Sequence, residues 1–132
     1  MKTVVFTIRG QKYGLYYNGN AMFEIQDLLD GDISLIFDVV RGRSKEKFSK
    51  LCQIVEIMSA QYVNAMRHLG YEVPDVLRAD YTQAVAAMRD IKVLQDMVIE
   101  AVNVGLEQEE VDEDREIDLG LIELQKKTAK PA

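Results

Sequence analysis

Apolar residues between positions 44 and 69 recur at steps of three and four, the spacing that lines up side chains along one face of an α-helix. Ser44 stands before this stretch and Gly70 after it. A serine hydroxyl can accept a hydrogen bond from a first-turn amide, and glycine readily takes the left-handed conformation that ends many helices. We therefore expect one long helix here, around which the rest of the chain is arranged. Its apolar stripe comprises Phe48, Leu51, Cys52, Val55, Met58, Tyr62, Met66 and Leu69.

A second, shorter apolar stripe borders the first and consists of Leu51, Ile54, Ile57 and Met58. The combined apolar surface is wider than a single neighbouring element would normally cover. Two interpretations remain open: a helix at the centre of the core, covered by several neighbours, or a face used for self-association or for binding a partner.

The first 17 residues alternate in the manner of β-strands. Residues 3–9 place Val4, Phe6 and Ile8 on one side, and residues 13–17 form the returning strand after a turn at positions 10–11. Gly14 inside the second strand indicates a bulge or a close backbone approach. We expect a hairpin that packs on a helix, because an isolated hairpin is only marginally stable in water.

Shorter apolar stretches predict four further helices, at residues 21–29, 35–40, 81–88 and 91–104, the last of them ending at Gly105. The first is expected to turn Met22, Phe23, Ile25, Leu28 and Leu29 toward a core. Their expected N-caps are, in the same order, Asn20, either Asp32 or Ser34, Asp80, and Asp90. The predicted fold class is α+β and mostly α: an N-terminal β-hairpin packed on a bundle of about four to five helices with one long central helix.

The negative charge of the chain is concentrated at its C-terminal end. Residues 1–106 carry 12 Lys and Arg against 13 Asp and Glu, a balance of −1, whereas residues 107–132 carry 4 against 9, a balance of −5. The charge therefore divides the chain into a compact domain, 1–106, and an acidic C-terminal tail, 107–132, that is partly disordered or docks onto a surface. Candidate docking residues in the tail are Leu119, Leu121, Ile122 and Leu124.

Side chains suited to catalysis are scarce. His68 is the single histidine and has no nucleophile near it in sequence, and Cys52 stands among apolar residues, where a thiol is inert. The acidic pairs of the tail lack the spacing and the glycine of a calcium loop. We expect a protein that is not an enzyme and has no cofactor or metal. Without an apolar run of about 18 residues or a signal-peptide pattern, we also expect no membrane association and an intracellular location.

Five cations form the one basic patch of the sequence: Arg41, Arg43, Lys45, Lys47 and Lys50. A loop and first helical turn left in solvent would explain them. Alternatively, the patch contacts nucleic acid or the acidic tail of a neighbouring copy. General nucleic-acid binding is disfavoured, because it needs an excess of positive charge.

The order of these segments resembles that of the tail assembly chaperones of long-tailed bacteriophages. The resemblance rests on the hairpin followed by NAMFEIQDLLDGD and ISLIFDVV, then on MRHLGYEVP, AVNVGL and the IDLGLIELQKK ending. It implies a non-enzymatic, oligomeric protein in the cytoplasm of a bacterial host that binds the tape-measure protein and keeps it soluble during tail assembly. Ile54, Ile57 and Met58 then become candidate oligomer or client contacts. The alternatives are a structural virion subunit, such as a head–tail connector or tail component, and a small regulatory or DNA-associated protein.

Overall fold

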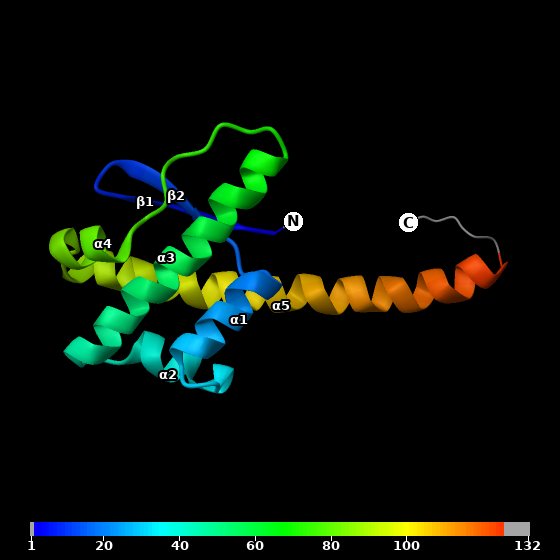
Figure 1. Ribbon diagram of the computed structural model, residues 1–132, viewed down its shortest axis with the longest axis horizontal. Helices are drawn as coiled ribbons and strands as arrows, with labels where there is room; N and C mark the ends of the chain where they lie inside the picture. Colours follow the sequence, from blue (N-terminus) through cyan, green and yellow to red (C-terminus); the bar gives the residue numbers. More distant parts are fainter. Residues whose placement is uncertain (1, 126–132) are drawn as a thin grey trace.

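A computed structural model describes residues 2–125 of the protein, with the side chains of residues 2–107. The fold class is α+β and mostly α, as predicted, with a two-stranded antiparallel hairpin packed on helices (Figure 1). The elements in chain order are β1 Val4–Ile8, β2 Gln11–Leu15, α1 Gly19–Leu28, the 3-10 turn η1 Ile33–Leu35, α2 Ile36–Arg41, α3 Lys45–His68, α4 Ala79–Val85 and α5 Met88–Gln125.

The hairpin β1–β2 turns one face into the core. Alternate residues of β1 are buried, from Val4 to Ile8, as the alternation predicts. Arg9 and Gly10 both have positive φ, 51° and 81°, which a tight two-residue hairpin turn requires. The turn therefore lies one residue earlier than predicted, and β2 begins at Gln11.

Gly14 marks a close approach and not a bulge. It pairs in regular register with Val5, and the ring of Tyr62 on α3 lies where a side chain would stand. A Cβ at Gly14 would be 2.5 Å from that ring, so the hairpin reaches α3 only because this position has no side chain. The amide of Tyr16 also donates to the carbonyl oxygen of Met58 at 3.1 Å.

Helix α3 is the central element, and the predicted signals at both its ends are confirmed. The Ser44 hydroxyl accepts a hydrogen bond from the Lys47 amide at 3.1 Å, and Gly70 has a φ of 87°. The helix contacts β2, α1, α2, α4 and α5, which surround it on several sides.

Helix α1 begins two residues earlier than predicted, because Asn18 and not Asn20 is its cap. The Asn18 Oδ1 accepts a hydrogen bond from the Ala21 amide at 2.9 Å. Ile25 and Leu29 are fully buried, but Phe23, which was expected in the core, is 62% exposed. Asp32 caps the following turn, η1, as one of the two predicted alternatives.

Polar side chains of α3 hold the segment that leads to α4. The Ser59 hydroxyl, itself buried, accepts a hydrogen bond from the Leu77 amide at 2.8 Å. The Glu56 carboxylate accepts one from the Ala79 amide, at 2.6 Å, in the first turn of α4. Asp80, which was predicted to cap this helix, lies inside its first turn; the cap position is held by Arg78, whose side chain makes no capping hydrogen bond. The buried part of α3 therefore satisfies the backbone donors of the chain that covers it.

Helix α5 continues through Gly105, so the predicted end of the helix at that residue is wrong. A Cβ at Gly105 would lie 2.7 Å from the carbonyl oxygen of Tyr17. The glycine therefore lets α5 pack closely against the chain leaving β2, and it does not end the helix. Beyond residue 107 the helix extends away from the rest of the molecule (Figure 1). The side chains of the predicted docking residues lie outside those described: Leu119, Leu121, Ile122 and Leu124.

One core joins the hairpin to the helices. Both strands and α1, α2, α3 and α5 contribute fully buried residues to it, with Ile8, Leu15, Ile25, Val40, Ile54 and Leu94 among them. Within residues 2–125, no helix combines the length and apolar character needed to cross a lipid bilayer.

Candidate functional site

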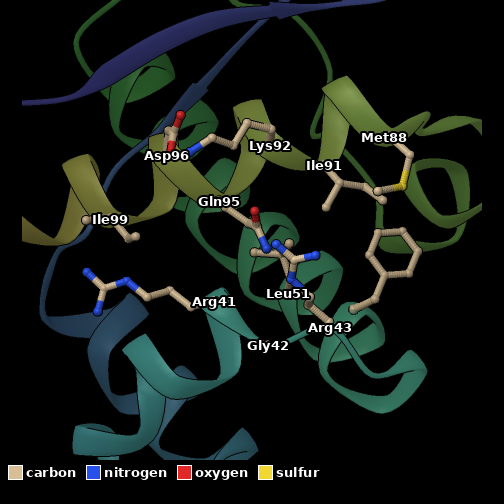
Figure 2. Close-up of a pocket in the computed structure, with 11 residues that line it drawn as sticks. Arg41, Gly42, Arg43, Leu51, Met88, Ile91, Lys92, Gln95, Asp96 and Ile99 are labelled. Carbon is tan, nitrogen blue, oxygen red and sulfur yellow. Dashed lines mark hydrogen bonds and ion pairs between the residues drawn. The ribbon is translucent and has the colours of Figure 1, made fainter.

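A groove opens where the chain passes from α2 to α3 and the start of α5 crosses beside it (Figure 2). We call it the α2–α5 groove; its volume is about 630 Å³. Its apolar lining comes from α3 and α5 and consists of Phe48, Leu51, Met88, Ile91 and Ile99. Its polar lining comes from the end of α2, the α2–α3 connection and α5, and consists of Arg41, Gly42, Arg43, Lys92, Gln95 and Asp96.

The apolar part of the groove follows from helical spacing on two helices. Phe48 and Leu51 are three residues apart on α3, and Ile91 and Ile99 are eight apart on α5, so each pair lies on one face of its helix. Leu51 is 1% exposed, whereas Met88 is 79% exposed. The floor of the groove is therefore closely packed, whereas its edge carries an exposed and flexible methionine side chain.

The charged part of the groove is mainly positive. Arg41, Arg43 and Lys92 supply three cations against the one carboxylate of Asp96, whose Oδ1 lies 3.0 Å from the Lys92 Nζ. In Figure 2 the side chains of Arg43 and Gln95 both extend toward the middle of the groove, and in this view the Arg41 guanidinium lies below Ile99. Arginine side chains pair readily with carboxylates, so this rim favours a negatively charged partner.

The structure divides the basic patch that the sequence suggested. Arg41 and Arg43 line the groove, whereas Lys45, Lys47 and Lys50 do not. Lys47 is instead paired with a carboxylate of α2, its Nζ 3.3 Å from Asp38 Oδ2.

Two of the three predicted contact residues on α3 are corrected by their burial. Ile54 and Met58 are both 0% exposed and belong to the core, so neither offers a surface to a second molecule. Ile57 is half-buried and packs against the same core. The wide apolar face is explained by the number of elements that pack on α3, which the sequence pattern around these residues does not reveal.

The two residues with the most reactive side-chain chemistry lie outside the groove. Burial raises the pKa of the Cys52 thiol to about 11, which keeps it protonated at neutral pH. The exposed His68 donates from Nδ1 to the carbonyl oxygen of Asn64 at 2.9 Å. Among the residues described, no three His, Cys, Asp or Glu side chains come together as metal ligands would. The arrangement of the groove suits binding: an apolar floor for apolar side chains and a cationic rim for carboxylates.

No family model matches the sequence, and no similar chain is found among the curated proteins or the solved structures. Inferences about function therefore depend on the fold, the groove and the distribution of charge.

Proposed function

We propose that this protein is a non-enzymatic tail assembly chaperone of a long-tailed bacteriophage, which binds the tape-measure protein and keeps it soluble while the tail is assembled. The observation that carries the proposal is the α2–α5 groove, an apolar floor with a cationic rim that is open at the molecular surface. The order of segments in the sequence, which resembles that of this family, supplies the identity of the client.

The physical requirement for such a protein is a surface that covers apolar helix stripes reversibly. A groove of about 630 Å³ falls within the usual range of binding pockets and accepts several apolar side chains. Each side chain that leaves water there contributes about 25 cal/mol per Å² of apolar area. Contacts of this size are weak singly, but several copies along one repetitive rod would hold it firmly through multivalency.

The test is co-expression with the tape-measure protein of the same phage, measuring the soluble fraction of that client. We expect the wild-type chain to raise that fraction several-fold, and Met88→Glu combined with Arg43→Glu to abolish the increase. Met88 and Arg43 are both exposed, so this variant keeps the fold, which circular dichroism can verify.

The matched control is Leu69→Glu, because Leu69 is 62% exposed and lies just past the opposite end of α3. This variant should keep the client as soluble as the wild-type chain does. A client equally insoluble with and without the wild-type chain would contradict the proposal. So would finding the protein as a stoichiometric component of purified virions, which is the behaviour of a structural tail subunit.

A further inference from the structure

We propose that the α2–α5 groove, when it holds no client, binds the acidic C-terminal segment of a second copy of this chain, residues 107–125. The contact is head-to-tail: the groove of one copy takes the helix end of the next. The contact between copies does not depend on the proposed function. The idea that the segment competes with a client for the groove does rest on that function.

Charge complementarity is the first argument. Residues 107–118 contain eight Asp and Glu against one Arg, the most acidic stretch of the chain. The groove presents Arg41, Arg43 and Lys92 against one carboxylate, Asp96, which is already paired with Lys92. One Arg against eight carboxylates gives the segment a net charge of −7, and three cations against one carboxylate give the groove lining a net charge of +2. The two carry opposite charge and therefore attract each other.

The composition of the segment also matches the floor of the groove. Directly after the acidic stretch, residues 119–124 include four apolar residues. The groove offers apolar contacts from the half-buried side chains of Phe48, Ile91 and Ile99 beside its cations. An acidic stretch followed by apolar residues thus meets a cationic rim beside an apolar floor, and burial of the apolar residues adds to the attraction of the charges.

The course of α5 means that a second copy must supply the segment. The start of this helix lines the groove, from Met88 to Ile99, and the same continuous helix carries the acidic stretch away from the body (Figure 1). At 1.5 Å per residue, residue 118 lies about 35 Å beyond Gln95 along the axis. A helix cannot fold back onto its own first turns, so each copy carries its groove at one end and its acidic segment at the other. Repeating that contact builds open chains of copies, because a head-to-tail interface need not close.

The test uses full-length charge-reversal variants, with the solution mass measured by sedimentation at several concentrations and low salt. The groove variant is Arg41→Glu with Arg43→Glu, and the segment variant is Glu109→Lys, Glu110→Lys and Glu113→Lys. We expect the wild-type chain to associate with increasing concentration and each variant alone to weaken that association about tenfold or more.

Mixing the two variants separates head-to-tail contact from any other association. The groove variant keeps an intact acidic segment and the segment variant keeps an intact groove, so an equimolar mixture should form a 1:1 dimer and stop there. All five substitutions in one chain leave neither an intact groove nor an intact acidic segment, so this variant should not associate alone or with either of the other two variants beyond one contact. The matched control, Lys45→Glu with Lys50→Glu, reverses two cations that do not line the groove and should associate as the wild-type chain does.

A wild-type chain that stays monomeric at low salt would overturn the proposal, as would variants that associate like the wild-type chain or a mixture that forms no dimer. The co-expression assay keeps this outcome distinct from the proposed function. If the segment variant solubilises the client better than the wild-type chain does, the segment competes for the groove, as proposed; an equal soluble fraction would mean that it does not compete. If the chain solubilises its client but never self-associates, the self-contact is wrong and the chaperone function stands. If the chain self-associates but does not solubilise the client, the chaperone function is wrong and the self-contact stands.

Discussion

The middle of α3 and its first turns are both apolar, but they meet different surroundings. Around Ile54 and Met58 the helix is covered by the hairpin, α1 and the segment leading to α4, which attach to it through hydrogen bonds as well as packing. Around Phe48 and Leu51 the neighbours are the short α2–α3 connection and the start of α5, and a groove remains between them.

The difference shows what leaves an apolar surface open. Only residues 42–44 connect α2 to α3, too few to fold over the first turns of α3. Arg41 and Arg43 lie at the rim of the groove and do not fill it with apolar atoms. The covered region therefore contributes to stability, and the open region is available for binding. Substitutions in the two regions should separate these two properties.

The largest expected effect is at the covered region. Ile54→Ala removes most of a fully buried side chain and should lower the free energy of unfolding by about 2–5 kcal/mol, measured by urea denaturation. Ile57→Ala should cost less, because Ile57 is only half-buried. In buffer without urea, where the Ile54→Ala variant is still folded, its self-association should equal that of the wild-type chain. An Ile54→Ala protein with unchanged stability and lost association would mean that the middle of α3 is an interface after all.

The second effect concerns Gly105. Alanine at an ordinary helical position is about 1 kcal/mol more favourable than glycine. Here the added Cβ would meet the Tyr17 carbonyl oxygen at 2.7 Å, so Gly105→Ala should instead lower the free energy of unfolding by about 1–2 kcal/mol. Gly19→Ala is the control, since a Cβ there meets nothing within 4 Å. Equal stabilisation by both substitutions would show that α5 and the chain after β2 are not in close contact.

The third effect is a pH dependence from Cys52. Burial raises the pKa of its thiol to about 11 in the folded protein, so the folded state keeps a proton that the unfolded chain releases near pH 9. The stability that this thiol contributes is complete below about pH 9 and falls as the pH rises toward 11. The difference in unfolding free energy between the wild-type chain and Cys52→Ala should therefore narrow over that interval. A constant difference would indicate a thiol that ionises freely.

Local signals predicted most of the fold. Alternation, caps and helical spacing identified the hairpin, the long helix with its Ser44 cap and Gly70 end, and the fold class, since each depends on residues close together in sequence. The prediction that Gly105 ends the helix was wrong because glycine is common both at helix ends and where two backbone segments approach closely. Only the position of Tyr17 distinguishes the two cases. Phe23 was assigned to the core because apolar character alone does not say which side of a short helix is covered.

The candidate site was only half predictable. Arg41 and Arg43 stood out as a cluster in the sequence, but Lys92 joins them from a helix about 50 residues further along the chain. The apolar partners Ile91 and Ile99 were assigned to a helix without any sign that they would border those arginines. A groove between distant segments depends on how the helices pack, and no local pattern encodes that arrangement.

The smallest expected effect on stability is at the rim of the groove, and it completes the comparison. Arg43 is exposed and belongs to no helix or strand, so Arg43→Glu should change the free energy of unfolding by no more than about 0.5 kcal/mol. Lys45→Glu, two residues on, should raise stability by about 0.3–1 kcal/mol, because a carboxylate suits the first turn of a helix. Both substitutions change the net charge equally, but only Arg43 lines the groove. Self-association at low salt should therefore weaken in Arg43→Glu and persist in Lys45→Glu. Equal weakening in both would mean that net charge, and not the groove, brings the copies together.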